Sequence, residues 1–421
     1  MSDQWQRRSL ASLGSYENGF AFNELHWSEH GLPIIRIAQI TGSQGIVDRF
    51  PGLLPDNYRI DDGDLIFSWS GTLAVVRWTG GSAWLNQHLF KVVPAEGIDR
   101  SFLFHVLQAS VAEMGKRTHG STMKHIKRGE LREFFVEIPR NEREQRKIAQ
   151  ILDTLDTEIR TTEALIDKLE AVKQGVLHDL LTRGIDANGQ LRPTQSDEPQ
   201  LYKESPLGLI PREWEIQKLG DLAEVSRGKF THRPRNDPAF FGGEYPFIQT
   251  GDVALAQGGY ISSYSQTLSE RGISVSQKFP IGTIAITIAA NIADTAVLAR
   301  PMFFPDSVVG AVVAPEHNIR FVELSIRRAK RALNARAPQS AQKNINLQDL
   351  RPLLVAVPSR SEQDSIAARY DALQARLEAE QIAVNKLLQK RSGLMDDLLT
   401  GRVRITPMLE SMQHTAAPTE A

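Results

Sequence analysis

The stretch IAQILDTLDTEIRTTEALIDKLEAVKQGVLHDL, residues 148–180, places apolar residues at steps that alternate between four and three. The same steps recur 218 positions later, in residues 366–398. Each series has ten such positions, eight of them apolar, and both are interrupted at the same two steps: Thr162 and Lys173 in the first, Glu380 and Arg391 in the second. An average spacing of 3.5 over this length predicts a coiled-coil seam. Two independent amphipathic helices, each on its own domain, would not explain why the interruptions coincide.

The four interrupting residues also predict how the helices pair. With Ile148 at heptad position d, Thr162 and Glu380 occupy d, and Lys173 and Arg391 occupy a. In an antiparallel pair, a layers face d layers, so one register sets Glu380 opposite Lys173 and Thr162 opposite Arg391. A parallel pair in equal register would set Lys173 against Arg391, two like charges. We therefore expect an antiparallel pair with a Glu380–Lys173 ion pair and an Arg391–Thr162 contact.

The segments before the two helices correspond as well. The stretch WQRRSL (5–10) matches WEIQKL (214–219), and GSTMKHIKRGELREFFVEIP (120–139) matches QSAQKNINLQDLRPLLVAVP (339–358). Likewise GDLIFSWSGTLAVV (63–76) matches GTIAITIAANIADTAVL (282–298), and each indicates a strand, a polar turn and a strand. The expected fold class is α+β, with two similar mixed α/β domains joined by two long helices that pair as an antiparallel coiled coil. The expected boundaries are 1–143 for the first domain, 144–183 for the first helix, 184–210 for a linker, 211–360 for the second domain, 361–405 for the second helix and 406–421 for a disordered tail.

Composition narrows the class of protein. A chain of 421 residues exceeds what one hydrophobic core usually supports, and 41% hydrophobic with 24% charged residues is typical of a globular protein. There is no cysteine, so disulfides and thiolate metal sites are excluded. The most apolar stretch, 281–299, contains Asn291 and Asp294 and alternates like two strands, which argues against a membrane span. The polar N-terminus is unlike a signal peptide, and we expect a cytoplasmic protein.

Two basic runs stand out on a chain whose net charge is only −1. Residues 115–132 hold six Lys or Arg against one Glu, and residues 325–343 hold six against no acid. Each run leads into a loop of small residues with a lysine, where hydroxyls and backbone amides can approach phosphates. A solvated helix face would explain either run alone, but recurrence at equivalent points favours two phosphate-binding surfaces. The candidates are Lys116, Arg117, His119, Ser121, Lys124 and His125 in the first run, and Arg331, Arg336, Ser340 and Lys343 in the second.

A second set of candidates lies in predicted turns and strand entries. Asn and Gln can bind adenine at two points, and Arg can do the same for guanine. Any single residue of this kind is more often structural or merely solvated. The candidates for DNA contact are Trp69, Ser70, Gln87 and His88 in the first domain, and Arg227, Lys229, Arg233, Arg235 and Asn291 in the second.

Catalytic motifs are not found in the sequence. It has no glycine-rich phosphate loop ending in Gly-Lys-Ser/Thr, no His-Glu-x-x-His, and no Asp/Asn-Pro-Pro-aromatic run typical of amino-methyltransferases. The histidines do not cluster at metal-ligand spacing; the i,i+4 pair His26 and His30 is followed by loop residues. We therefore expect no catalytic residues, no metal site and no cofactor.

The two copies resemble the specificity subunits of type I restriction–modification systems. The resemblance rests on GSTMKHI…LREFFVEIPRNEREQRKIAQIL (120–152) and LLTRG (180–184) in the first copy. In the second copy it rests on GLIPREWEIQKLGDL (208–222), AQKNINLQDLRPLLVAVPSRSEQDSIA (341–367) and LLTGR (398–402). It covers about residues 5–405 and departs from the family pattern at Gln339-Ser340-Ala341, where Gly-Ser/Thr-Thr is usual. It implies two target-recognition domains that each read half of a bipartite site in double-stranded DNA, and a helix pair that sets the gap.

The resemblance also implies partners. The chain would recruit two methyltransferase (M) subunits that use S-adenosylmethionine for adenine methylation, and restriction/translocase (R) subunits, while itself carrying no catalytic site. Two alternatives remain open at the level of sequence. An enzyme would need a catalytic constellation that the sequence lacks. A non-catalytic coiled-coil scaffold with non-specific DNA binding would explain the helices but not the two basic loops.

Overall fold

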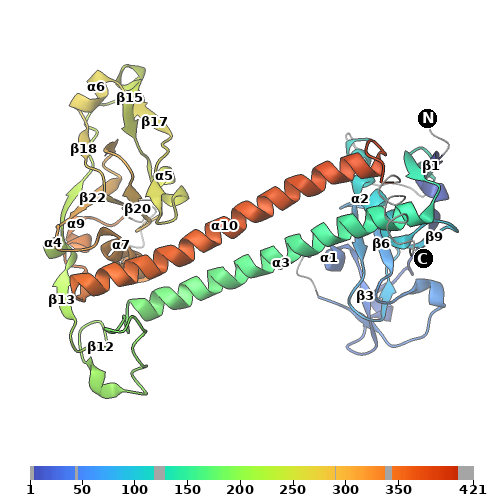
Figure 1. The fold of residues 1–421 in the computed structure, drawn as a ribbon, viewed down its shortest axis with the longest axis horizontal. Coiled ribbons are helices and arrows are strands. Elements are labelled where there is room, and N and C mark those ends of the chain that lie inside the picture. Colours follow the sequence, from blue (N-terminus) through green and yellow to red (C-terminus); the bar gives the residue numbers. More distant parts are fainter. Residues whose placement is uncertain (1–3, 43–45, 118–128, 290, 337–343, 406–421) are drawn as a thin grey trace, which may run out of the picture. The chain divides into compact units, whose positions relative to one another are not determined.

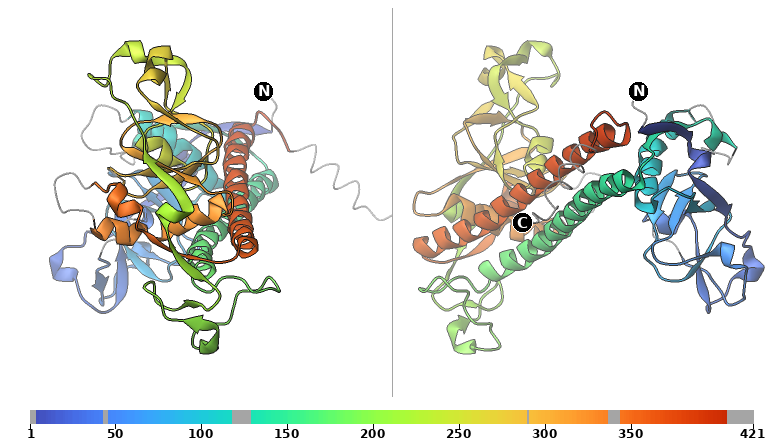
Figure 2. Two further views of the ribbon diagram at one scale, coloured as in Figure 1. Left: turned by 90° about the vertical axis from the view of Figure 1, so that its left-hand side faces the viewer. Right: turned by 45° about the vertical axis from the view of Figure 1, so that its right-hand side comes forward.

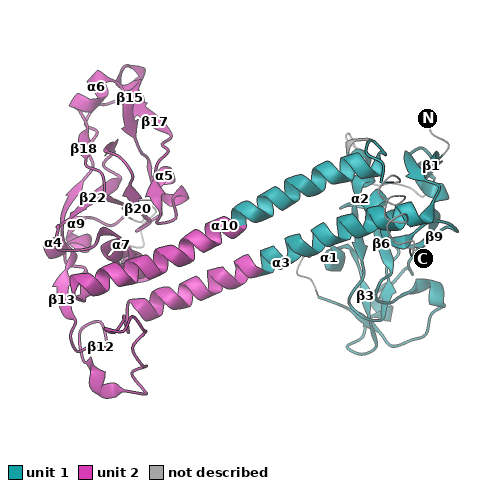
Figure 3. Cartoon of the chain, viewed as in Figure 1, with its two compact units in different colours: residues 1–164, 381–421 teal, residues 165–380 magenta. Residues whose placement is uncertain are grey.

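The computed structural model describes residues 4–42, 46–117, 129–289, 291–336 and 344–405. The chain forms two compact units, shown in separate colours in Figure 3. Unit 1 comprises residues 1–164 and 381–421, and unit 2 comprises residues 165–380. Each unit therefore contains one mixed α/β module and a part of both long helices. Within the described ranges, no helix combines the length and the apolar character needed to cross a bilayer.

The module of unit 1 is built on two four-stranded sheets (Figure 1). The first has the antiparallel order β2 (Gly14–Asn18), β9 (Leu89–Pro94), β6 (Leu65–Ser68) and β7 (Ala74–Arg77). The second has the order β4 (Arg49–Phe50), β3 (Leu32–Ile35), β8 (Ala83–Leu85) and β5 (Arg59–Ile60), with β3 and β8 parallel. A separate pair joins β1 (Trp5–Ser9) to β10 (Phe135–Pro139). The helices are α1 (Ile37–Ile40), α2 (Arg100–Arg117) and the 3-10 turns η1 (Leu10–Ser12), η2 (Glu24–His26), η3 (Asp56–Tyr58) and η4 (Glu130–Arg132).

Unit 2 repeats this plan. Its first sheet has the order β14 (Ala223–Arg227), β22 (Val308–Val313), β19 (Ile284–Thr287), β20 (Thr295–Leu298) and an added β16 (Tyr260–Ile261). Its second sheet has the order β17 (Gln266–Leu268), β15 (Phe241–Phe247), β21 (Met302–Phe304) and β18 (Gln277–Phe279), again with a parallel central pair. The separate pair is β13 (Glu215–Lys218) with β23 (Leu354–Val357). The helices are α4 (Leu219–Leu222), α5 (Thr250–Leu255), α6 (Glu270–Ser274), α7 (Ile319–Arg328), α8 (Lys330–Arg336), α9 (Leu347–Leu350) and the 3-10 turn η6 (Pro238–Phe240).

Continuous apolar runs form the central strands because both of their faces are covered. In β6, Leu65 and Phe67 point into the core that includes α2, whereas Ile66 points into the core of the second sheet. In β19, Ile284 and Ile286 likewise face one core and Ala285 faces the other. Side chains alternate between the faces of a strand, so a strand between two cores favours apolar residues at successive positions.

The repeat extends to single hydrogen bonds. The backbone amide of Asp99, before α2, donates to Oε1 of Gln145 at 2.9 Å. The backbone amide of Asn318, before α7, donates to Oε1 of Gln363 at the same distance. Both buried glutamines also donate from Nε2 to a proline carbonyl at the end of the preceding strand, at 3.0 Å. Each glutamine thus satisfies backbone groups of its own module, and this fixes the start of the long helix that carries it.

The two long helices are α3 (Glu142–Leu180) and α10 (Arg360–Leu399). In unit 1, Ile148 and Leu152 of α3 share a core with Leu394 and Leu398 of α10, and farther along α3 Asp156 pairs with Arg391. The two segments therefore run antiparallel. In unit 2, Val176 and Leu177 of α3 pack in one core with Ile366 and Tyr370 of α10. Figure 2 shows the two helices side by side within each unit. The predicted α+β class and antiparallel coiled coil are confirmed.

The predicted register is wrong. Arg391 binds the Asp156 carboxylate, six positions before Thr162, and also donates to Oε1 of Gln108 on α2. The Thr162 hydroxyl instead donates to the Glu158 carbonyl of its own helix at 2.8 Å.

The other predicted pair is absent too. Lys173 lies over the Tyr370 ring, with Nζ 5.8 Å from the ring centroid, and among the described residues no ion pair joins it to Glu380. The ends of both helices are buried in apolar cores. This burial contributes more free energy than a polar pair worth about 1 kcal/mol, and it therefore fixes the register.

The repeated LLTRG and LLTGR sequences mark where the helices enter these cores. Leu180 and Leu181 are buried in the core of unit 2 with Trp214, and Leu398 and Leu399 in that of unit 1 with Trp5. The following glycines, Gly184 and Gly401, both have φ +68°, a conformation that favours glycine after a helix. Between α3 and β13, the connector is ordered by the 3-10 turn η5 (Pro199–Leu201) and the pair β11 (Tyr202–Lys203) and β12 (Ile210–Pro211).

Candidate nucleic-acid interface

Several sequence candidates of unit 1 meet at one edge of the first sheet. Because the neighbouring strands are antiparallel, the end of β2, the start of β9 and the end of β6 lie at the same edge. Trp69 follows β6, and Gln87 and His88 precede β9. These three side chains line an open groove of about 540 Å³.

The geometry of this groove combines flat rings with hydrogen-bonding groups. Trp69 stacks on Phe90, with 5.7 Å between the ring centroids, and its centroid lies 5.9 Å from that of His88. Nε2 of Gln87 lies 3.4 Å from Nε2 of His88. The Asn18 side chain donates to the Gln87 carbonyl at 3.1 Å, which holds the turn in place. An amide and an imidazole beside a tryptophan can bind base edges by hydrogen bonds and by contact with the ring faces.

The sequence reasoning missed other lining residues, namely Asn18, Phe20, Ala21 and Tyr58. Phe20 lies edge-to-face against Tyr58, with 5.5 Å between the centroids, and extends the aromatic wall. The polar Asn-Gly pair at the end of β2 was a usable signal, because a strand end in this sheet opens onto the same edge. Ser70 is not part of the lining; it is buried, and its carbonyl accepts a hydrogen bond from the Ser68 hydroxyl at 3.3 Å.

The equivalent edge of unit 2 carries arginines. Arg227 ends β14, and Arg233 and Arg235 follow on the next loop. Arg235 pairs with the Asp306 carboxylate at 2.7 Å and Arg233 lies 3.9 Å from it, while Arg227 donates to the Asp306 carbonyl. One carboxylate therefore neutralises only part of the charge of three guanidinium groups. Half of the Arg233 and Arg235 side chains stays exposed, so the edge presents net positive charge.

The remaining candidates of unit 2 are dispersed around this edge. Lys229 is exposed, and its backbone amide donates to the Phe304 carbonyl at 3.0 Å. Asn291 is exposed in the turn between β19 and β20, and its carbonyl accepts from the Thr287 hydroxyl. Arg331 is exposed on α8. His119, Ser121, Lys124, His125, Ser340 and Lys343 lie outside the described residues, and for Lys116, Arg117 and Arg336 only the helical backbone is described.

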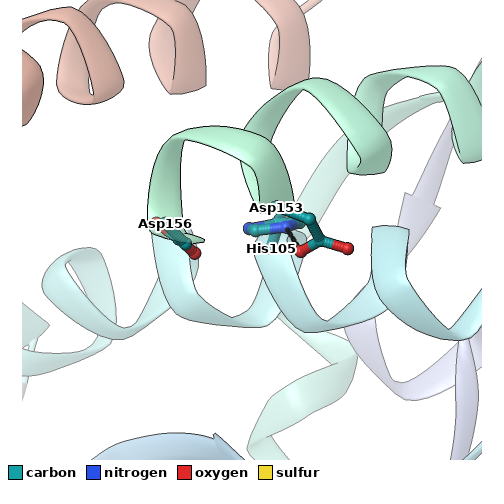
Figure 4. A group of neighbouring side chains, drawn as sticks. All are labelled: His105, Asp153 and Asp156. Atoms are coloured by element: carbon teal, nitrogen blue, oxygen red, sulfur yellow. Dashed lines mark hydrogen bonds and ion pairs between the residues drawn. The ribbon is translucent and has the colours of Figure 1, made fainter. Parts of the chain in front are cut away.

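One group of side chains has the spacing of a metal site but a different role. His105, Asp153 and Asp156 bring ligand atoms within 4.8 Å of one another (Figure 4). Nε2 of His105 and an Arg77 guanidinium nitrogen both lie 2.7 Å from Oδ1 of Asp153, and Asp156 pairs with Arg391. Burial lowers the pKa of His105, and Asp153 opposes this. Two guanidinium groups already balance the two carboxylates, so the cluster serves to hold α2, α3 and α10 together within unit 1.

Comparison with known proteins accords with this arrangement. A family model described as the type I restriction modification DNA specificity domain matches residues 2–171 and 211–388. The chain belongs to this family. The specificity subunit of the type I restriction enzyme EcoBI from Escherichia coli is 24% identical over 428 aligned positions, covering 96% of this chain and 86% of its own. The MjaVIII specificity subunit from Methanocaldococcus jannaschii is also 24% identical, covering 86% and 84%.

Solved structures share the fold. The S subunit of a type I restriction–modification system from M. genitalium has a TM-score of 0.60 at 15% identity, covering 95% of this chain and 97% of its own. A chain from a structure described for complex assembly and conformational transition of the type I system has a TM-score of 0.55 at 14% identity, covering 96% and 99%. The match over nearly the full length of each shows that both modules and both helices belong to one specificity-subunit fold.

Proposed function

We propose that the chain is the DNA-recognition component of its type I system, and that each module reads one half of a bipartite site. The observation that carries this proposal is one sheet edge built twice with different side chains. Unit 1 presents Trp69, Gln87 and His88 beside an aromatic wall, whereas unit 2 presents a cluster of arginines and Asn291. Equivalent edges with different donors and acceptors suit two different base sequences.

We further propose that the helices set the gap between the half-sites and that the chain itself catalyses no reaction. The M subunits would supply S-adenosylmethionine-dependent adenine methylation, and the R subunits translocation and cleavage. The family membership and the relatives named as specificity subunits support this division of labour. The rival function is a coiled-coil scaffold with non-specific DNA binding, which would not need different side chains at the two edges.

Selection from a random duplex library by the full chain with its M subunits tests the proposal. The expected result is a site with two conserved parts and an unspecified gap. Gln87→Ala should relax preference in one half only, and Asn291→Ala in the other, each losing about 1–3 kcal/mol of discrimination at the bases concerned. Each substitution is the control for the other. Binding without sequence preference would favour the scaffold.

The lysines in the two basic loops give a separate test. Lys124→Ala and Lys343→Ala should each weaken binding to all sequences alike and lower the salt dependence by about one phosphate contact. A changed sequence preference with an unchanged salt dependence would assign these lysines to base reading instead.

A further inference from the structure

Unit 2 contains a pocket of about 790 Å³ whose lining includes Arg331, one of the candidates for phosphate contact. Its walls come from the last third of α3, from α7 and α8, from the turn between β19 and β20, from the end of α5, and from Tyr370 of α10. The lining includes five cationic side chains: Lys173, Arg327, Arg328, Lys330 and Arg331. Asp294 is the acid among the lining residues, and it is already paired with Lys330.

Three of the cations have no carboxylate partner within ion-pair distance among the described residues. Arg327 pairs with the buried Glu323 at 2.6 Å, and Lys330 with Asp294. Lys173 lies over the Tyr370 ring, Arg328 donates to the Leu181 carbonyl at 2.7 Å, and the third, Arg331, is exposed. Burial lowers the pKa of Lys173, and the positive charge of Arg327 lowers it further. An anion in the pocket would relieve this repulsion.

The equivalent residues of unit 1 carry no excess positive charge. There Arg391 of α10 is neutralised by Asp156 of α3, with the neutral Gln108 of α2 beside it. The repeat places Lys173 at the position of Arg391, Gln374 at that of Asp156 and Arg327 at that of Gln108. Unit 2 therefore has a neutral glutamine where unit 1 has an acid, and an arginine where unit 1 has a neutral glutamine.

Further along α7 and into α8, unit 2 again has cations where unit 1 has neutral residues. The capping side chains Asp99 and Asn318 accept from the amides of Phe102 and Phe321, which aligns α2 with α7. On that alignment Arg328, Lys330 and Arg331 replace Ala109, Val111 and Ala112 of the first copy. The positive charge is therefore a property of unit 2, not of the shared fold.

We propose that this pocket binds a backbone phosphate of the DNA duplex beside the half-site read by unit 2. The inference rests on the proposed DNA recognition. Ala293 and Asp294 line the pocket and belong to the same turn as the exposed Asn291, so the pocket adjoins the residue proposed to meet a base. Arginine and lysine donors around one cavity suit phosphate oxygens.

The test compares the double variant Lys173→Gln/Arg331→Gln with Lys168→Gln in full-length protein. Lys168 is an exposed lysine of α3 in unit 2 that does not line the pocket. The affinity for duplex DNA is measured between about 50 and 200 mM salt, with melting temperatures confirming that all variants fold. The loss of one phosphate contact lowers the slope of log affinity against log salt by about 0.9, whereas the control keeps the wild-type slope.

An unchanged salt slope in the double variant overturns the pocket assignment. If the base preference is lost at that unchanged slope, the two residues read bases and do not bind a phosphate. A second measurement is acetylation of Lys173 in the presence of competitors. If a poly-glutamate peptide protects Lys173 and duplex DNA does not, the pocket binds an acidic protein partner and the phosphate proposal is overturned. The salt slope is also measurable on non-specific DNA. Failure of the proposed site recognition, seen as wild-type binding without sequence preference, is therefore distinguishable from failure of the phosphate pocket.

Discussion

The Glu362 carboxylate and the Arg192 guanidinium meet at two points in unit 2, with Nη2 and Oε2 separated by 3.0 Å and each side chain about 10% exposed. The same carboxylate accepts from the Trp214 indole at 3.2 Å and from the Ile185 amide at 2.8 Å. Glu362 stands in the first turn of α10, Ile185 follows α3, and Trp214 precedes β13. One buried acid thus joins three segments that are far apart in the sequence.

Replacing Glu362 by Gln should therefore destabilise unit 2 strongly. The substitution removes the buried counter-charge of Arg192 and leaves it only the exposed Glu213 carboxylate at 3.3 Å, so the loss should approach the ~3–5 kcal/mol typical of breaking a buried pair. The measurement is hydrogen exchange of the β13 and β23 amides in the full chain. Glu144 is the matched control: it is the equivalent buried residue of unit 1, but none of the described residues forms an ion pair with it. Equal effects of Glu144→Gln and Glu362→Gln would contradict the role given to Arg192.

Gly184→Ala should be more harmful than its backbone conformation alone requires. A Cβ at Gly184 would lie 2.2 Å from Oε1 of Glu362 and 2.4 Å from the Trp214 ring, in addition to the strain of φ +68°. Gly189, in the same connector, has φ +75° and open space around its Cβ position. Gly189→Ala should cost about 1 kcal/mol from strain alone, and Gly184→Ala clearly more. Urea unfolding of both variants measures the difference; similar losses would show that the contacts yield easily.

The sequence predicts the strands and the long helices because each depends on periodicity within a short window. The repeat follows from segments that recur about 218 positions apart, and the antiparallel pairing from the polar residues that interrupt both seams. The register was mispredicted because a seam does not say which partner a polar residue will find. Arg391 reaches Asp156 and Gln108, and Gln108 comes from a helix of the module rather than from the coiled coil.

The groove of unit 1 was only partly predicted, because some of its lining residues come together only through the strand order of the sheet. Trp69, Gln87 and His88 stand out as turn residues, but Asn18 joins them only through the strand order of the sheet. The Asn-Gly pair marks a strand end, but strand order is a long-range property, and no local pattern shows that this end lies beside Gln87.

Acid should weaken unit 1 through His105. Burial lowers the pKa of the folded histidine below its unfolded value of about 6.5. Above pH 6.5 both states are neutral and nothing is lost. As the pH falls below 6.5 the unfolded state takes up the proton first, so stability falls until the folded pKa is reached, by at most about 1.4 kcal/mol per pH unit.

Urea unfolding at about pH 7.5, 6.5 and 5.5 tests this effect. His105→Gln should flatten the loss of stability between the last two values, relative to the unsubstituted chain. The same substitution at His178, an exposed residue of α3, is the control. An unchanged pH dependence in His105→Gln would mean that other groups account for the acid sensitivity.

The spacing between the half-sites should follow the length of the helix pair. Seven residues inserted between Ala164 and Leu165 of α3, and seven between Glu380 and Gln381 of α10, fall at the boundary of the two units in both helices. The pairing within each unit is therefore left intact. One heptad adds about 10.5 Å at ~1.5 Å per residue, or about three base pairs at ~3.4 Å each.

Duplexes with gaps of different length, presented to the chain with its M subunits, should show a preferred gap longer by about three base pairs. Insertion into α3 alone should instead disturb the pairing and lower the melting temperature. If the double insertion left the preferred gap unchanged while the protein stayed folded, the helices would not set the spacing.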